Sequence, residues 1–299
     1  MNALIDRPLW QPDAARIAGA NVTAFIADAN ERWGLALRDY DDLYEWSLRS
    51  PESFWQSVWV FGGVIGEPGS VVLEDGDRMP GARWFPEAKL NFARNLLRSR
   101  DESDAIVFWG EDKVKNRLTH ADLYRQVAHF AAALKELGVG KGDRVAAFMP
   151  NMAETVVAML ATTAIGAVFT SASPDFGTQG VVDRFGQTEP KVLVAVDGYY
   201  YNGKTVDCLA KVAEVADKLP SLKRVVVVPY VHAEHDLSAI KHGRMLTDFV
   251  APWHFESEIP FEDLPFDHPL YIMYSSGTTG VPKCIVHGAG GTLLQHLKE

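Results

Sequence analysis

Cysteine is scarce in this sequence, and basic residues are outnumbered by acidic ones. The 299 residues include only Cys208 and Cys284, too few for a disulfide framework or a four-cysteine zinc site, so we expect a protein of the reducing cytoplasm. Lys and Arg number 29 against 39 Asp and Glu, which gives a formal charge of −10. This balance argues against a nucleic-acid surface, which needs clustered basic side chains, but it leaves nucleotide binding open.

One uncharged stretch has the length of a membrane span but not its composition. Residues 155–174 carry no charge, yet Thr and Ser fill six of the twenty positions and the stretch ends in Pro174. We therefore expect a buried helix followed by a short strand, and no association with a membrane. The first ten residues contain Asp6 and lack an apolar core, which is not typical of a secretory signal.

Residues 1–61 have the pattern of a helical region. Apolar side chains recur from Val22 to Trp33 at spacings of three and four behind Asn21, which we expect to cap the helix. Pro51 is expected at the first position of another helix. A passage that contains several Gly and Pro follows over residues 62–81. We therefore expect a helical N-terminal region over residues 1–80 and a second region over residues 81–299.

From about residue 117 the sequence alternates between helical and strand patterns. Thr119 is expected to cap a helix that Gly138 ends, and further helices are expected over residues 153–165, 178–188 and 205–219. Short apolar strands without polar alternation lie between them: VAAFM, AVFT, KVLVAV and RVVVVP, with LYIMY later. This order predicts an α/β fold with a mostly parallel sheet covered by helices on both faces. Residues 230–268 are expected to be largely irregular.

The segment that points to chemistry is SSGTTGVPK, residues 275–283, directly after the LYIMY strand. Its glycines allow the backbone to approach a ligand, its amides and hydroxyls can donate to an anion, and Lys283 adds a positive charge. It is not a Walker A loop, which needs Lys next to Gly and a helix directly afterwards, because here CIVH predicts a second strand. The residues alone leave two interpretations: an anion-binding loop, or a Ser/Thr/Gly-rich hairpin without a ligand.

SSGTTGVPK resembles the phosphate-binding signature of the acyl-adenylate-forming enzymes, a superfamily of acyl-CoA synthetases, luciferases and peptide-synthetase adenylation domains. The chain departs from the usual pattern at Cys284, where Gly commonly follows the Lys. At this position the chain resembles the acetoacetate–CoA ligases. Two longer segments are also similar to these ligases: PGARWFPEAKLNFARNLL and SPDFGTQGVVDRFGQTEPKVLVAVDGYYYNGK. The resemblance runs from residue 8 to residue 299. Acetyl- and propionyl-CoA synthetases share the layout and remain alternatives.

The resemblance implies an ATP-dependent ligase that joins acetoacetate to coenzyme A through an acyl-adenylate, with Mg²⁺ as cofactor. It implies that the loop holds ATP and pyrophosphate through Ser275, Ser276, Gly277, Thr278, Thr279, Gly280 and Lys283, and that Thr279 contacts Mg²⁺. It also makes Lys204 and Tyr201, in DGYYYNGK, candidate contacts for coenzyme A, with an ordinary surface turn as the alternative. No catalytic residue is identified within the chain.

Other reactive side chains have simpler interpretations. His232, Glu234 and His235 lack the spacing of a zinc-binding helix, so we expect no metal there. His287, after a strand and beside a glycine-rich turn, either lines the nucleotide pocket or is a hydrogen-bonded structural residue. Cys284 is expected to be a small packed side chain and not a nucleophile.

The last residues, TLLQHLKE, are expected to form a helix without a stop signal. With the resemblance, this suggests the N-terminal portion of a longer ligase, which binds phosphate weakly and does not complete the reaction alone. An incomplete sheet edge would then favour self-association. The alternative is a stand-alone, non-catalytic nucleotide-binding module.

Overall fold

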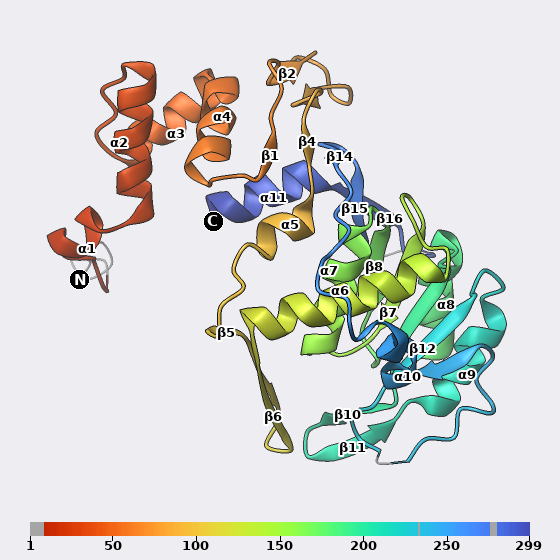
Figure 1. Cartoon of the computed structure of the whole chain (residues 1–299). Coiled ribbons are helices and arrows are strands. Elements are labelled where there is room, and N and C mark those ends of the chain that lie inside the picture. Colours follow the sequence, from red (N-terminus) through yellow and green to blue (C-terminus); the bar gives the residue numbers. More distant parts are fainter. Residues whose placement is uncertain (1–8, 233, 276–279) are drawn as a thin grey trace, which may run out of the picture. The chain divides into compact units, whose positions relative to one another are not determined.

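The computed structural model describes residues 9–232, 234–275 and 280–299, and these form two units (Figure 1). The first unit contains residues up to 64, residues 70–84 and residues 294–299. The second contains residues 65–69 and 85–293. The expected boundary between residues 80 and 81 stays a prediction.

Among the described residues, the first unit contains the helices α1 (Ala14–Ala18), α2 (Asn21–Trp33), α3 (Tyr40–Arg49) and α4 (Pro51–Phe61), with the short strands β2 (Leu73–Glu74) and β3 (Arg83–Trp84). The last residues of α11 (Ala289–Lys298) also belong to it. Pro51 occupies the first turn of α4, which confirms the prediction. The predicted cap of α2 was wrong: Ala20 is the capping residue, and Asn21 is already helical. Gly34, with φ 64°, ends α2 in the left-handed conformation that glycine adopts without steric cost.

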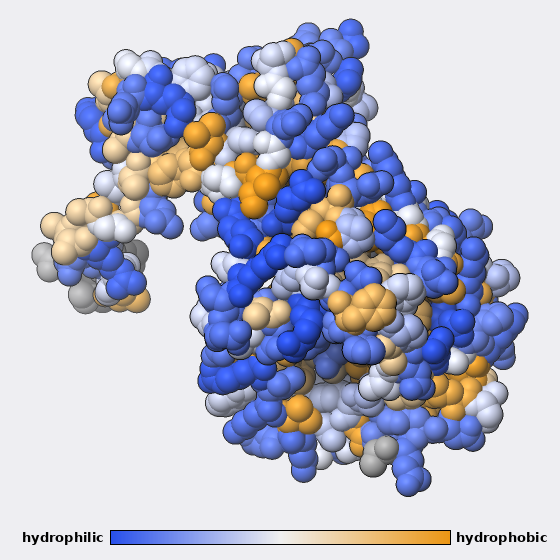
Figure 2. All heavy atoms as spheres, viewed as in Figure 1, coloured by the Kyte–Doolittle hydropathy of each residue, from blue (hydrophilic) through white to orange (hydrophobic). Residues whose placement is uncertain are grey.

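The helices of this unit surround a cavity of about 640 Å³ with a mostly apolar wall. Phe25 lies edge-on to Phe54 and Phe61, with ring centroids 5.9 Å and 5.2 Å away, and Trp55 and Leu297 complete this part of the lining. Figure 2 shows hydrophobic residues at the surface of these helices. The aromatic contacts, with their buried area, stabilise a unit that has little sheet of its own.

A seven-stranded sheet organises the second unit. Its strands lie in the order β13 (Gly243–Met245), β12 (Arg224–Val228), β9 (Val192–Val196), β7 (Arg144–Phe148), β8 (Val168–Ala172), β15 (Pro269–Tyr274) and β16 (Cys284–Gly288). Neighbours are parallel as far as β15, and only β16 is antiparallel to its neighbour. The predicted α/β fold with a mostly parallel sheet is confirmed.

Helices cover both faces of this sheet (Figure 1). On one face α6 (His120–Glu136) packs against α7 (Ala153–Ala164) and α10 (Leu246–Val250), and α8 (Thr178–Thr188) packs beside α9 (Leu209–Lys218) on the other. Thr119 caps α6 by accepting from the amide of Asp122, as predicted. The uncharged stretch forms α7 and β8. In the described part of the chain, no helix combines the length and hydropathy needed to cross a membrane.

The remaining elements lie outside the seven-stranded sheet. They are α5 (Phe92–Leu96), the hairpins β5 (Asp104–Gly110) with β6 (Val114–Thr119) and β10 (Gly198–Tyr201) with β11 (Lys204–Asp207), a small sheet of β1 (Gly66–Glu67), β4 (Lys89–Leu90) and β14 (Leu264–Pro265), the 3₁₀ turn η1 (Ala251–Trp253), and α11 (Ala289–Lys298).

Three predictions in this part of the chain were wrong. The helix expected over residues 205–219 begins only at Leu209, because residues 204–207 pair with β10 as strand β11. Residues 230–268 are less irregular than expected, since they contain β13, α10, η1 and β14. The glycine-rich turn after His287 is instead the start of α11, which begins at Ala289.

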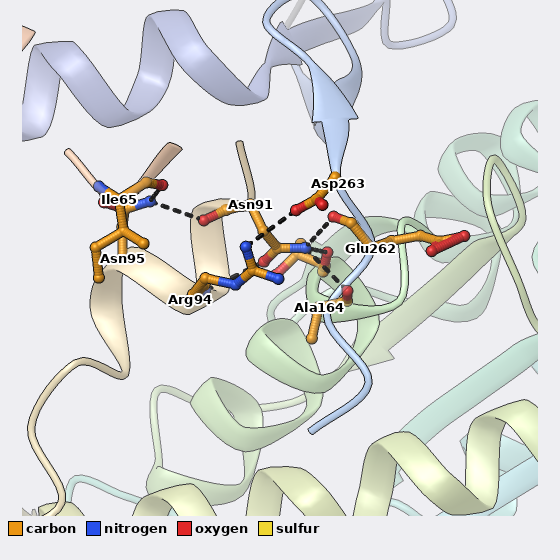
Figure 3. Close-up of polar contacts among 8 residues, drawn as sticks. Ile65, Asn91, Arg94, Asn95, Ala164, Glu262 and Asp263 are labelled. Carbon is orange, nitrogen blue, oxygen red and sulfur yellow. Dashed lines mark hydrogen bonds and ion pairs between the residues drawn. The ribbon is translucent and has the colours of Figure 1, made fainter. Parts of the chain in front are cut away.

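A buried asparagine joins three distant segments of the second unit (Figure 3). Asn91, fully buried, donates from Nδ2 to the carbonyl of Ala164 at 2.9 Å and to that of Glu262 at 2.8 Å. One turn later Asn95 pairs with both backbone groups of Ile65, donating from Nδ2 and accepting at Oδ1. These bonds satisfy carbonyls that end α7 and precede β14, and thereby hold the chain that leads into β15.

We expect Asn91→Ala to lower the free energy of unfolding by about 2 kcal/mol, because two carbonyls lose their donor, the fully buried amide of Asn91. Urea unfolding followed by circular dichroism measures this. Asn116→Ala, at an exposed hairpin position, is the matched control and should change stability by less than about 0.5 kcal/mol. Equal unfolding midpoints for the two variants would contradict the role of Asn91.

Candidate anion-binding site

The SSGTTGVPK segment leaves the sheet at the carboxyl end of β15. The amide of Ser275 donates to the carbonyl of Lys283 at 3.0 Å, directly beyond the Tyr274–Cys284 pair of β15 and β16. The predicted loop between two strands is therefore confirmed. Since β15 is parallel to β8, the loop lies at the edge of the sheet where the parallel strands end, the edge at which α/β sheets commonly bind ligands.

Three of the seven predicted loop residues can be placed. Ser275 is half-buried, Gly280 is exposed with φ 95°, and Lys283 is exposed. Residues 276–279, which carry the other four predicted contacts and the expected Mg²⁺ contact of Thr279, lie outside the described residues. The geometry at the loop base leaves the Lys283 side chain accessible to a ligand.

The strand that leads into the loop is tied to the sheet by side chains. Thr170 of β8, almost fully buried, donates its hydroxyl to the carbonyl of Ile272 at 2.8 Å and lies 2.8 Å from the Tyr274 hydroxyl, which donates to it. Burial raises the pKa of Tyr274, so this phenol keeps its proton and remains a donor across the physiological range. The residue directly before the loop is thereby fixed.

A second group of candidate residues follows β9. Tyr201 and Lys204 face each other as the last pair of the β10–β11 hairpin, on either side of its turn. Both are exposed, Tyr201 at 66%. The structure thus brings the two predicted coenzyme A contacts together. β7 and β8 lie between β9 and β15, so three strand spacings, roughly 14 Å, separate the ends of β9 and β15 along one edge.

A buried carboxylate fixes this second group. Asp197, fully buried after β9, accepts the backbone amides of residues 230–232 and lies 2.8 Å from Nε2 of His235. His232 in turn reaches Asp207 of β11 at 2.7 Å. Each imidazole is thus engaged with one carboxylate, and none of the described residues forms a cluster of three or more metal-ligating side chains.

Two further predicted residues lie on β16. Cys284 is exposed, so the expectation of a packed side chain was wrong: β16 is the last strand of the described sheet, and its first three residues are all exposed. His287 pairs with Tyr271, their rings 5.1 Å apart, and is half-buried. Because β16 runs away from the loop, His287 lies three positions along the strand from the loop base, and its role stays a prediction.

Comparison with known proteins places this arrangement in a family. The family described as AMP-binding enzyme matches residues 92–298, and the one described as acetyl-coenzyme A synthetase N-terminus matches residues 40–96. The chain belongs to the AMP-binding enzymes. The resemblance read from the sequence is thereby confirmed.

Several relatives of this AMP-binding chain share one name. Acetoacetyl-coenzyme A synthetase of Rhizobium meliloti is 52% identical over 295 residues, covering 98% of this chain and 45% of the relative. Acetoacetyl-CoA synthetase of Macaca fascicularis is 44% identical, with 97% and 44% covered. The solved structure of acetoacetyl-CoA synthetase from Streptomyces lividans superposes with a TM-score of 0.91 at 45% identity, covering 98% of this chain and 45% of that one. The chain spans less than half the length of these relatives.

Several residues of the site in this AMP-binding chain were not found from the sequence. Thr170 and Tyr274 lie in strands whose pattern predicts burial but not which hydroxyls meet. Asp197 follows an apolar strand, and a single acidic residue there gives no signal that three amides will surround it. Only the pairing of distant segments makes these contacts visible.

Near the carboxyl edge of the sheet lies a glutamate whose ionisation lowers the stability of the fold. Glu154 lies in the first turn of α7, just after β7, and burial raises the pKa of its carboxyl above the ordinary value of 4.5. A raised folded-state pKa means that ionisation costs stability, fully at pH values above the folded pKa and not at all below the unfolded one. The ionised Glu154 carboxylate therefore lowers the stability of the folded chain at neutral pH.

We expect Glu154→Gln to be more stable than the wild type at pH 7, because the cost of ionisation is removed. The difference should shrink once the pH falls below the raised folded-state pKa, where the folded carboxyl takes up its proton, and it should vanish near the ordinary value of 4.5. Urea unfolding at several pH values measures it, with exposed Glu102→Gln as the control. A gain that is independent of pH would contradict the account.

Proposed function

We propose that this chain is part of an ATP-dependent acid–thiol ligase that forms acetoacetyl-CoA from acetoacetate and coenzyme A through an acyl-adenylate. The observation that carries the proposal is the similarity to acetoacetyl-CoA synthetases over 98% of the chain. The sparse cysteines favour a cytoplasmic protein. Acetate and propionate are the alternative substrates.

The chemistry has two steps. In the first, a carboxylate oxygen of acetoacetate bonds to the α-phosphorus of ATP and the bond to pyrophosphate breaks. In the second, the thiolate sulfur of coenzyme A bonds to the acyl carbon and the bond to AMP breaks. Charge develops on the phosphates in the first step, so pre-positioned donors and cations are what a protein can contribute.

We assign the β- and γ-phosphates to the β15–β16 loop. Lys283 and the hydroxyls and amides of residues 275–280 supply the donors, and hydroxyl and phosphate oxygens are ligands that Mg²⁺ accepts. Bound Mg²⁺ would offset phosphate charge, with Thr279 as its protein contact. The adenine end of coenzyme A is assigned to the β10–β11 hairpin, where the Tyr201 ring can stack and Lys204 can meet a phosphate.

Pyrophosphate exchange tests the proposed reaction. In a polypeptide of the relatives' length, acetoacetate should support exchange of labelled pyrophosphate into ATP at least tenfold faster than acetate or propionate. The 299-residue chain should bind pyrophosphate in a calorimetric titration without supporting exchange. Faster exchange with acetate than with acetoacetate would show that acetate is the substrate in place of acetoacetate. Binding without exchange at any length would favour a non-catalytic nucleotide-binding module.

Replacing Lys283 should weaken pyrophosphate binding. A hydrogen bond between charged groups contributes about 1.5–3 kcal/mol, so Lys283→Ala should lower the affinity roughly 10- to 100-fold while leaving the unfolding midpoint unchanged. Lys223→Ala is the control, since the exposed Lys223 precedes β12 at the opposite edge of the sheet. Equal affinities in the titration would remove Lys283 from the site.

Reversing the charge of Lys204 should weaken coenzyme A binding. We expect Lys204→Glu to lower the affinity at least tenfold, because the ammonium that meets a phosphate becomes a repelling carboxylate. Lys113→Glu, at the exposed turn of the β5–β6 hairpin, makes the same change in a similar setting and should have no effect. If both variants bind coenzyme A like the wild type, the hairpin is an ordinary surface turn.

We also propose that the free edge of β16 pairs with a second copy of the chain. Among the described strands β16 has a neighbour on one side only, and Ile285 and Val286 are 47% and 56% exposed. Unpaired amides beside exposed apolar side chains favour edge-to-edge pairing.

Analytical ultracentrifugation tests this pairing. The wild-type chain should show concentration-dependent dimers, and Val286→Lys should abolish them. Val107→Lys, at a similarly exposed position of the β5–β6 hairpin, should leave the dimers intact. A wild-type chain that stays monomeric at 100 μM, roughly the range in which weak pairing becomes visible, would overturn the proposal.

A further inference from the structure

Helix α8 contacts the loop base through Gln187. This residue lies in the last turn of α8, and its Nε2 donates to the carbonyl of Pro282 at 2.9 Å and to that of Asp183, in its own helix, at 2.6 Å. The side-chain amide has two N–H donors, and both are used. The bond to Pro282 joins positions 95 residues apart in the sequence.

The same helix also contacts the residue before the loop. The Arg184 guanidinium lies over the Phe176 ring at 4.1 Å and over the Tyr274 ring at 5.8 Å. Tyr274 immediately precedes Ser275, whose amide bonds to the Lys283 carbonyl at 3.0 Å. One face of α8 therefore supports both chain segments at which the loop begins and ends.

The contact at Pro282 controls the direction of the next peptide. Pro282 has no N–H and a fixed φ, so its carbonyl is its only backbone hydrogen-bonding group. That carbonyl shares a rigid plane with the amide of Lys283, and the two point in opposite directions. Holding the carbonyl toward α8 thus turns the Lys283 amide away from α8 and restricts where the lysine side chain starts.

We infer that Gln187 is a positioning residue for the anion-binding loop: it orients the Pro282–Lys283 peptide so that Lys283 meets the phosphates of a nucleotide or pyrophosphate. This rests on the proposed function. Without the bond, ligand binding would have to order this peptide, and the ordering would reduce the affinity. Gln187 is exposed and otherwise bonds only within its own helix among the described residues, so its loss should not unfold the chain.

Calorimetric titration of the 299-residue chain with pyrophosphate in the presence of Mg²⁺ tests the inference. Gln187→Ala should lower the affinity about three- to tenfold, as the loss of one hydrogen bond predicts, with an unchanged unfolding midpoint. Gln179→Ala is the matched control. Gln179 is also exposed on α8, and its amide donates to the Asp183 carboxylate at 2.6 Å, a bond within the helix that does not reach Pro282.

Gln187→Glu separates positioning from a merely structural role. At pH 8 its carboxylate cannot donate to the Pro282 carbonyl, and the affinity should fall at least as far as in Gln187→Ala. At about pH 4.5 a large fraction of this carboxyl is protonated and can donate again, so the affinity relative to the wild type at the same pH should recover. Gln187→Ala should show no such recovery.

The outcomes distinguish this inference from the function on which it rests. A wild-type chain that fails to bind pyrophosphate overturns the proposed function and the inference with it. Wild-type binding with unchanged affinity in Gln187→Ala overturns the inference alone. A loss in Gln187→Ala matched by an equal loss in Gln179→Ala would show a general effect of α8 and would also overturn it.

Discussion

The position of the loop depends on the narrow seam between β8 and β15. Only two register pairs join these strands, Tyr271 with Phe169 and Ile272 with Thr170. The Thr170 hydroxyl adds a bond to the Ile272 carbonyl and accepts one from Tyr274, inside a nearly dry interior where unmade hydrogen bonds are costly. If this seam opened, β15 and β16 would leave the sheet together and take the loop with them.

The parallel direction of the sheet then places two binding candidates at one edge. The loop follows β15 and the hairpin follows β9, and both strands run in the same direction. A loop can position a ligand when its two ends are held by rigid elements, here the sheet and α8. Thr170 fixes the strand that leads into the loop, and Asp197 fixes the start of the hairpin in a similar way. Asp197 accepts hydrogen bonds from three backbone amides of a segment that follows β12.

The sequence is informative wherever the decisive forces are local. Helix α8 begins and ends where its pattern predicts, Thr119 caps α6, and the four consecutive valines of β12 are buried. Prediction fails where a partner is distant or a preference is weak. The β10–β11 hairpin replaces an expected helical turn because Lys204 finds a pairing partner in Tyr201, and the Asn91 amide joins carbonyls 73 and 171 residues away. No local pattern encodes such contacts.

We propose above all that the β15–β16 loop is an anion site held by the sheet and α8. Hydrogen–deuterium exchange of the chain with and without pyrophosphate tests it most directly. The account predicts slower exchange in peptides that cover residues 275–283 and the last turn of α8, with no change in the β10–β11 hairpin. Unchanged exchange across residues 275–283 under saturating pyrophosphate, or protection confined to another segment, would contradict it.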